Sequence, residues 1–224
     1  MRIALALLVL SSLSACAAPG PQRFERTRLA PQADPGKVIA TEIAFARAAR
    51  DDGQWTAFRR YAANAAIMYD GEGIRPAAEF LNGRADPERA VAWAPHHVWS
   101  SCDGSVAVTT GAWALDPVGG EFLTVWWRGA DGEYRFIADG ARVADEMPQA
   151  PAMIGADVAS CNGTPDEPAP MATVLDRTAG GQSDDGTLHW RVGVEPGQEV
   201  ALRIDLWNGT AFDAVVAQTH SVTP

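Results

Sequence analysis

The stretch VAWAPHHVWSSCDGSVAVTTGAWALDPVGGEFLTVWWRGADGEYRFIAD, residues 91–139, decides the fold class. It contains four apolar segments, at 91–101, 106–115, 122–127 and 134–139. Three turn dipeptides separate them, Asp103-Gly104, Gly119-Gly120 and Asp131-Gly132. Such pairs favour the positive φ angles of tight hairpins. The stretch therefore predicts a four-stranded antiparallel meander.

The residues before the meander have helical periodicity. Residues 37–50 place apolar side chains on one face, and Gly53 follows as a stop signal. Residues 54–63 repeat the pattern, and a short strand at 65–69 and a short helix beginning at Arg75-Pro76 come next. We expect an α+β domain over residues 37–145, with helices packed on a curved antiparallel sheet.

The residues after the meander predict a second β unit. Residues 146–171 form a Pro-rich crossing, and three segments beyond it have strand patterns, at 187–194, 200–207 and 211–217. Residues 146–224 are therefore expected to be the crossing plus an additional C-terminal antiparallel β unit. Whether its strands extend the first sheet or pack separately is left open by the pattern.

The first residues have the pattern of a bacterial export signal. Residues 3–10 are an apolar run too short to span a bilayer, and Leu13-Ser14-Ala15-Cys16 resembles a lipobox. The resemblance implies a signal peptide at 1–15, lipidation of Cys16 and a flexible tether over 16–36. Ala17 after the cysteine implies a lipid anchor at the periplasmic face of the outer membrane. An ordinary secretory signal is the alternative.

Composition limits the partners. The formal net charge is −10, and it becomes −11 when Arg2 is removed with the signal. Such an acidic chain repels phosphate backbones, so we expect no nucleic-acid partner. The sequence contains no phosphate loop, nucleophile elbow or zinc-ligand spacing, so we expect neither a cofactor nor a metal.

The two remaining cysteines, Cys102 and Cys161, are expected to form a disulfide. An even pair in an oxidising compartment is normally bridged. The alternative, a catalytic thiol, lacks a basic neighbour, and Asp103 beside Cys102 would raise a thiol pKa rather than lower it.

Four segments between residues 37 and 142 carry a likeness to a known superfamily, namely Glu42 to Ala49 before Gly53, Ala65 to Asp70, Thr124 to Trp127, and Asp131 to Asp139. They resemble the SnoaL-like and ketosteroid-isomerase-related superfamily, which includes nuclear transport factor two and has the cystatin-like cone fold. The resemblance implies a conical pocket between helices and sheet. Its members include enzymes, binders and assembly modules, so the fold does not decide the function.

The superfamily's isomerases and dehydratases imply an Asp or His base inside the cone. Asp70 ends the early strand near the expected cone mouth, and His97 shares strand parity with Trp93 and Trp99. These are the catalytic candidates, Asp70 as base and His97 as orienter. Their structural alternatives are a turn residue and a hydrogen-bonded core histidine.

Asp139 before Gly140 has the same ambiguity as Asp70. The other pocket candidates are aromatic, namely Tyr61, Tyr69, Trp93, Trp99 and Trp127. Core packing is their alternative role.

The expected function is that of a membrane-anchored envelope lipoprotein whose cone cavity binds a small apolar molecule or a peptide segment without catalysis. One rival is an isomerase or dehydratase that uses Asp70 and His97. The other is a structural module that docks an envelope protein.

Overall fold

The computed structural model describes residues 32–70, 72–144, 146–163, 165, 177–194 and 200–218. The predicted signal, the lipidation residue Cys16 and most of the tether lie outside the described residues.

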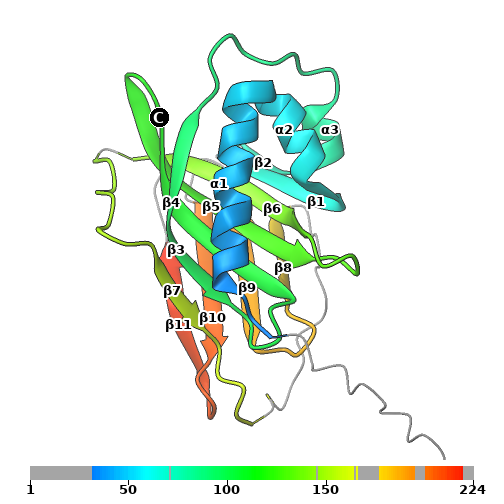
Figure 1. Cartoon of the computed structure of the whole chain (residues 1–224), viewed down its shortest axis with the longest axis vertical. Helices are drawn as coiled ribbons and strands as arrows, with labels where there is room; N and C mark the ends of the chain where they lie inside the picture. The colour runs from blue at the N-terminus through cyan, green and yellow to red at the C-terminus, as the bar shows by residue number, and fades with distance from the viewer. Residues whose placement is uncertain are drawn as a thin grey trace, which may run out of the picture.

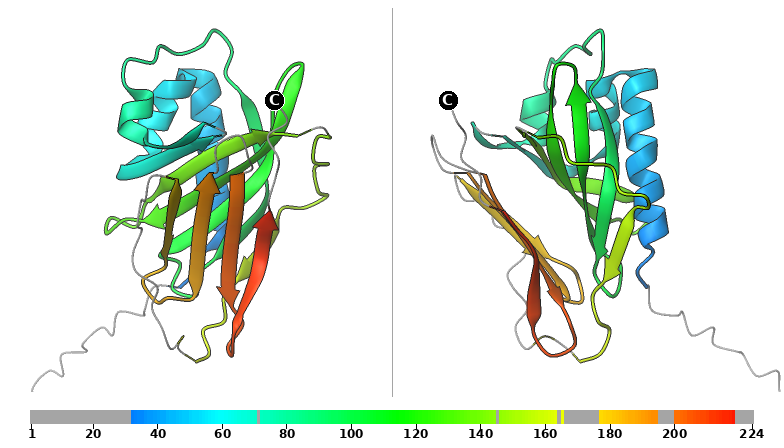
Figure 2. Two further views of the ribbon diagram at one scale, coloured as in Figure 1. Left: turned by 180° about the vertical axis from the view of Figure 1, so that it is seen from behind. Right: turned by 90° about the vertical axis from the view of Figure 1, so that its left-hand side faces the viewer.

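The described chain has three layers (Figures 1 and 2). Helices α1 (Pro35–Asp52), α2 (Gln54–Tyr61) and α3 (Ala77–Leu81) cover one face of a seven-stranded sheet. A four-stranded sheet covers the opposite face (Figure 2). The chain is therefore α+β, with the predicted helix-covered sheet and a separate C-terminal antiparallel sheet.

The large sheet has the order β2-β1-β6-β5-β4-β3-β7. Its strands are β1 (Ala62–Asp70), β2 (Gly73–Pro76), β3 (Ala92–Ser100), β4 (Val106–Leu115), β5 (Val118–Arg128), β6 (Tyr134–Val143) and β7 (Gly155–Val158). The four strands β3 to β6 form the predicted antiparallel meander, but the turn between β4 and β5 is at Asp116-Pro117. The predicted Gly119-Gly120 turn is wrong, because both glycines lie inside β5, where Gly120 lets the backbone of β6 approach closely. The sheet is mixed rather than wholly antiparallel, because β1 pairs with β6 and β7 pairs with β3 in parallel. Long connections allow these parallel pairs, whereas hairpins force antiparallel ones.

Helix α1 begins where the sequence places capping residues. The side chain of Asp34 accepts a hydrogen bond from the backbone N–H of Lys37 at 3.0 Å, and Pro35 occupies the first turn. The helix ends at Gly53, whose φ of 109° suits a glycine. Phe45 on its buried face contacts Trp126 and Phe136 of the sheet, with centroids 6.0 and 5.9 Å apart.

The C-terminal strands pack as a sheet of their own, which answers the question that the sequence leaves open. They are β8 (Thr178–Gln182), β9 (Leu188–Val194), β10 (Val200–Trp207) and β11 (Phe212–Gln218), in the order β11-β10-β9-β8. Trp190, Val192 and Ile204 from this sheet share one buried cluster with Val108 and Val125 of the large sheet. Burial of these alternating apolar residues holds the two sheets together.

The predicted disulfide between Cys102 and Cys161 is present, with Cα atoms 5.2 Å apart and a sequence separation of 59. Cys102 lies in the turn between β3 and β4, and Cys161 follows β7. The bridge therefore joins the crossing to the meander.

Two turns of matching sequence also join the sheets. Residues 101–105 and 183–187 both read Ser, any residue, Asp-Gly, then Ser or Thr. In each turn the second side-chain hydroxyl donates to the Asp carboxylate. Three further bonds run between the turns, from Cys102 N to Thr187 Oγ1 (2.9 Å), from Asp184 N to Ser105 Oγ (2.8 Å) and from Asp103 N to Asp185 Oδ2 (2.9 Å). The first two are reciprocal, so the turns dock with an approximate two-fold relationship.

Candidate ligand cavity

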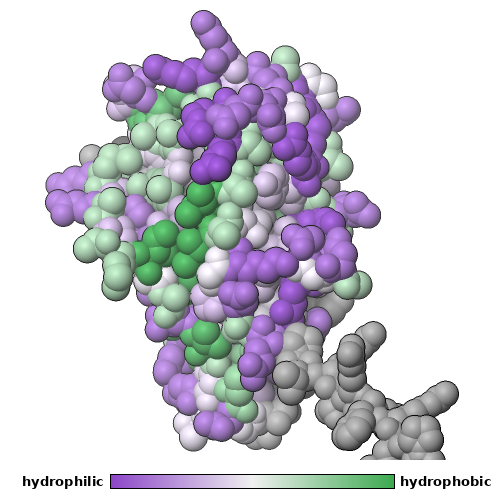
Figure 3. All heavy atoms as spheres, in the orientation of Figure 1, coloured by the Kyte–Doolittle hydropathy of each residue, from purple (hydrophilic) through white to green (hydrophobic). Residues whose placement is uncertain are grey.

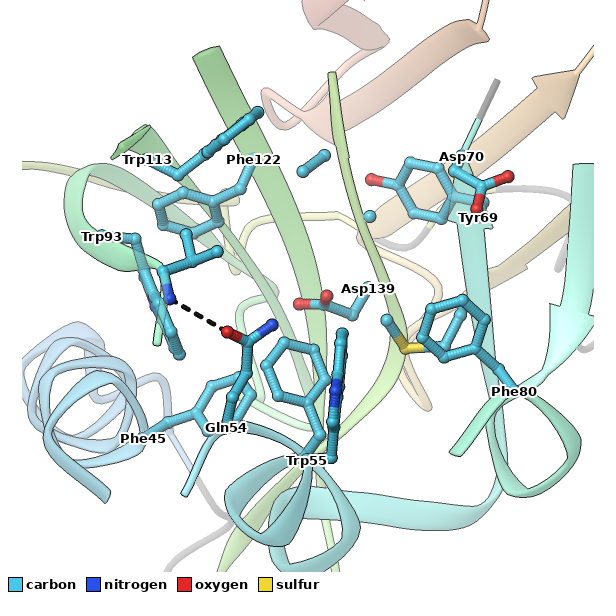
Figure 4. A pocket seen from close by; sticks show the side chains of 15 residues that line it. Phe45, Gln54, Trp55, Tyr69, Asp70, Phe80, Trp93, Trp113, Phe122 and Asp139 are labelled. Atoms are coloured by element: carbon cyan, nitrogen blue, oxygen red, sulfur yellow. Dashed lines mark hydrogen bonds between the residues drawn. The ribbon is translucent and has the colours of Figure 1, made fainter. Parts of the chain in front are cut away.

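A cavity of about 220 Å³ lies between the helices and the inner face of the large sheet (Figure 4). Its lining residues are Phe45, Gln54, Trp55, Phe58, Met68, Tyr69, Asp70, Phe80, Val91, Trp93, Trp113, Phe122, Asp139, Gly140 and Ala141. They come from all three helices and from strands β1, β3, β4, β5 and β6. The position is that of the predicted conical pocket.

Aromatic rings make up most of the wall. Phe45 contacts Phe58 and Trp93 edge to face, with centroids 4.7 and 4.9 Å apart. Trp55 contacts Phe80 in the same manner at 5.7 Å. Edge-to-face packing is favoured by the aromatic quadrupole and fixes the ring positions. The wall is therefore built before any ligand binds.

Asp139 on β6 is the buried acid of the cavity, with 8% of its surface exposed. Its Oδ2 accepts a hydrogen bond from Thr124 Oγ1 at 2.6 Å. Within the described chain, Oδ1 accepts no hydrogen bond, and Figure 4 shows the carboxyl pointing into the cavity. Burial raises the pKa of Asp139 to about 7; the Thr124 bond opposes this rise, and the charge of Glu42 adds to it. The carboxyl therefore changes charge near neutral pH.

Glu42 joins α1 to the sheet and contacts Trp93 of the cavity wall. It is fully buried and accepts three hydrogen bonds, from Trp93 Nε1 (2.7 Å), Thr109 Oγ1 (2.5 Å) and Trp126 Nε1 (3.1 Å). Burial raises the pKa of Glu42, and the three donors work against that rise. Together with Thr124 and Asp139, Glu42 forms a polar strip across the inner face of the sheet.

Gln54 at the start of α2 supplies the second polar group. Its Oε1 accepts a hydrogen bond from the backbone N–H of Val91 at 2.9 Å. Because only the amide oxygen can accept that bond, the orientation of the amide is fixed. Figure 4 shows Gln54 and Asp139 directed into the same cavity. The cavity therefore presents one carboxyl and one amide to a ligand.

Asp70 is among the residues that line the cavity, but its carboxylate already accepts hydrogen bonds from its own neighbours. Its carboxylate accepts hydrogen bonds from Arg75 and from the backbone N–H of Glu72, the latter at 2.9 Å. This Asx-type turn matches the structural alternative for Asp70.

His97 lies on the opposite face of the sheet. It pairs with Asp157 on β7 at 2.8 Å and stacks on Trp99, with centroids 4.3 Å apart. The pairing of β3 with β4 shifts between Pro95 and His97, so an extra residue reverses the faces beyond it. The parity that joins His97 to Trp93 in the sequence is broken at this bulge. The structure therefore does not bring Asp70 and His97 into one site.

The aromatic candidates divide between cavity and core. Tyr69 and Trp93 line the cavity, and the Tyr69 hydroxyl donates to the backbone oxygen of Leu123 at 2.8 Å. Tyr61 is outside the lining and packs against Phe45, and Trp99 belongs to the cluster between the sheets. Trp127 is 37% exposed and lies outside the cavity lining.

Two residues of the site were missed from the sequence. Glu42 carries a usable signal, because it lies on the buried helical stripe with Val38, Phe45 and Ala49, where an acid needs donors. Gln54 has no such signal, since its environment depends on the distant Val91.

The outer surface has dispersed apolar groups. Figure 3 shows a band of apolar residues beside α1 that polar residues interrupt. Exposed large apolar side chains among the described residues are Ile43, Val118, Trp127, Val143, Met147, Met153 and Val158. They lie on several different elements.

No helix within the described residues has the length and apolarity to cross a membrane. The same part of the chain contains no group of three or more His, Cys, Asp or Glu that could hold a metal ion.

Solved structures resemble part of the chain. A protein of unknown function from the DUF3225 family of Pectobacterium atrosepticum is 12% identical, with a TM-score of 0.39, over 49% of this chain and 90% of its own. A protein of Parabacteroides distasonis, provisionally assigned as a ketosteroid isomerase, is 14% identical, with a TM-score of 0.40, over 52% of this chain and 98% of its own. At such low identity and TM-score, neither likeness says anything about the activity of this chain.

No protein-family model and no curated protein sequence matches the chain. The described elements themselves show the α+β class that the sequence predicts, with helices on one face of a large sheet and an additional C-terminal antiparallel sheet.

Proposed function

We propose that the chain binds a small, mostly apolar molecule in the cavity between the helices and the large sheet. The observation that carries this proposal is an aromatic-walled cavity of about 220 Å³ into which the Asp139 carboxyl points. Ligand sites commonly combine an apolar wall with a few placed polar groups that orient the ligand. Here the rings supply contact area, and Asp139 and Gln54 supply orientation.

A neutral fluorescent probe, N-phenyl-1-naphthylamine, tests this proposal. Its emission should rise when the wild-type protein is added, because the probe enters an apolar site. Ala141→Phe should abolish the rise, since Ala141 lines the cavity at an exposed position where a larger ring costs little stability. Ala114→Phe is the matched control, because Ala114 is also exposed on a strand but lies outside the lining. Equal binding to both variants would place the probe elsewhere and contradict the proposal.

A second candidate function is proton transfer by Asp139. The observation that favours it is a cavity carboxyl whose pKa of about 7 lets it take up and release protons near neutral pH. Gln54 would donate a hydrogen bond to the substrate oxygen, and the Asp139 carboxylate would remove a proton from the neighbouring carbon. Asp139 thus takes the role that the sequence gives to Asp70.

A small β,γ-unsaturated ketone, 3-cyclohexen-1-one, tests this candidate. In D₂O, the protein should speed deuterium exchange next to the carbonyl, and the rate should rise through about pH 7. Asp139→Asn should lose this activity, while Asp70→Asn should keep it. Equal loss in both variants, or no exchange by wild type, would exclude Asp139 as the base.

We also propose that Cys16 carries the lipid that holds the chain at the periplasmic face of the outer membrane. The support is the lipobox-like Leu13-Ser14-Ala15-Cys16 and the apolar run before it. Cells fed an alkyne-labelled fatty acid should label the wild-type protein and not Cys16→Ser. A labelled Cys16→Ser protein, or an unlabelled wild type in the soluble fraction, would overturn the anchor and favour an ordinary secretory signal.

A further inference from the structure

We propose that the ligand of the cavity is a small organic cation, an amine or quaternary ammonium compound that carries a hydroxyl or ether oxygen. This inference rests on the proposed binding function and names its ligand class. It follows from three features of one cavity. These are its aromatic rings, a carboxyl that has no ionic partner among the described residues, and an amide whose orientation is fixed by a hydrogen bond.

The ring arrangement suits a cation. Trp93 and Trp55 line the cavity together with several phenylalanine rings. The guanidinium of Arg84 lies over the Trp55 and Phe80 rings, 5.4 and 3.9 Å from their centroids, so this wall already contacts one cation. Figure 4 shows these rings around the Asp139 carboxyl. Tryptophan faces are the best aromatic partners for alkylammonium groups, and several rings together form an aromatic cage.

The charges on the cavity wall have one sign. The fifteen lining residues include two acids, Asp139 and Asp70, and no basic residue. Arg75 neutralises Asp70, so Asp139 is the carboxyl that lacks an ionic partner among the described residues. A buried carboxylate without a counter-ion is costly, and a bound cation would remove that cost.

Gln54 determines the second group on the ligand. Its amide oxygen is occupied by the backbone N–H of Val91, so the groups left to the ligand are the amide N–H donors. Those donors suit a hydroxyl or ether oxygen on the cation. A carboxylate on the ligand would be repelled by Asp139, which disfavours zwitterions.

The charged and titratable groups around Asp139 give the direction of the pH dependence. Glu42 faces it from α1, and the pKa of Tyr69 on β1 is raised well above its usual value by burial and by the Asp139 charge. Arg75 on β2 is paired with Asp70, and the exposed Arg84 stacks on Phe80 and Trp55 from outside the lining. None of these replaces a counter-ion for Asp139. Cation binding should therefore strengthen as Asp139 loses its proton, by about tenfold between pH 6 and pH 8.

Choline and its uncharged isostere 3,3-dimethyl-1-butanol form a matched probe pair, because they share shape and hydroxyl and differ in charge. Titration of the full chain by calorimetry at pH 8 should show choline binding at least about tenfold tighter than the isostere. Equal affinity of the two probes would overturn the cation inference and leave the proposed apolar binding intact. Binding of neither probe would overturn the inference as well, and the naphthylamine result would then decide the fate of the proposed function.

Asp139→Asn isolates the charge without changing the shape of the side chain. This variant should lose the preference for choline and its pH dependence, so that choline and the neutral isostere bind with similar affinity. Asp131→Asn is the control, because Asp131 is an exposed acid in the turn before β6, where it pairs with Arg135. If Asp139→Asn keeps the wild-type preference for choline, the assignment of the cation to Asp139 is wrong.

Discussion

Thr124 Oγ1 donates a 2.6 Å hydrogen bond to Asp139 Oδ2, and the two residues face each other across the β5–β6 pair. This bond stabilises the charged form of a carboxyl whose pKa burial raises to about 7. Thr124→Val keeps the volume and removes the donor, so we expect the pKa of Asp139 to rise further. Infrared titration of the carboxyl stretch, with Asp139→Asn to assign the band, measures the shift. An unchanged or lower pKa would contradict the role of Thr124.

The raised pKa of Asp139 also predicts how stability depends on pH. The unfolded carboxyl loses its proton near pH 3.8, and the folded one near pH 7. Between these values the folded state binds more protons, so the free energy of unfolding falls as pH rises, by about 4 kcal/mol at most. Urea denaturation should show that Asp139→Asn becomes more stable relative to wild type as the pH rises from 4 to 8. A constant difference across this range would contradict the raised pKa.

Glu42 is predicted to contribute strongly to stability because it accepts hydrogen bonds from three donors on the sheet. Glu42→Leu removes the carboxylate that accepts from Trp93, Thr109 and Trp126, and Trp126 Nε1 keeps only its 2.9 Å bond to Thr109 Oγ1 among the described residues. We expect a loss of about 3 to 5 kcal/mol in the free energy of unfolding. Glu42→Gln keeps an acceptor and should lose less. Denaturant titration measures both variants, and equal losses would show that the acceptor is unimportant.

The hydrogen bonds between the two matching turns are predicted to stabilise the packing of the two sheets. Thr187→Val removes the hydroxyl that accepts from Cys102 N and donates to Asp185. We expect a loss of about 1 to 2 kcal/mol, because the backbone N–H of Cys102 loses its partner. Thr210→Val is the matched control, since the Thr210 hydroxyl bonds only to Asn208 at an exposed turn. Similar small losses in both variants would mean that the turn contact adds no stability.

The disulfide is predicted to raise the free energy of unfolding by more than the turn contact does. Cys102 and Cys161 are separated by 59 in the sequence, and chain-entropy estimates for a loop of this size give about 4 kcal/mol. The double variant Cys102→Ala, Cys161→Ala should lose stability of that order, and reduced wild type should unfold at a similar denaturant concentration. Denaturation that is insensitive to reductant would contradict a bridge that stabilises the fold.

The local features of the fold were predictable from short stretches of sequence. The Asp103-Gly104 and Asp131-Gly132 turns lie between strands as predicted, whereas Gly119-Gly120 lies inside β5. Asp34, Pro35 and Gly53 mark the ends of α1. Strand β8, TAGGQ, was missed because it has no apolar alternation, and it owes its extended form to pairing with β9.

The sequence predicted the site only in part. Side chains of a strand alternate between the two faces of the sheet, and a bulge interrupts this alternation. One extra residue between Pro95 and His97 moved His97 to the far face, while Trp93 kept its place in the cavity. Asp139, which the sequence leaves between turn residue and base, lies on β6 with its carboxyl directed into the cavity.

The sequence by itself determined the order of the elements, the helix-covered meander and the pairing of Cys102 with Cys161. These follow from local periodicity, from turn chemistry and from the small number of cysteines. Only the tertiary structure decided that the C-terminal strands form a separate sheet, that the side chains of Asp139 and Gln54 face the cavity, and that His97 lies on the opposite face of the large sheet. Burial and partners across the chain set the protonation and orientation of those groups, and neither is encoded in neighbouring residues.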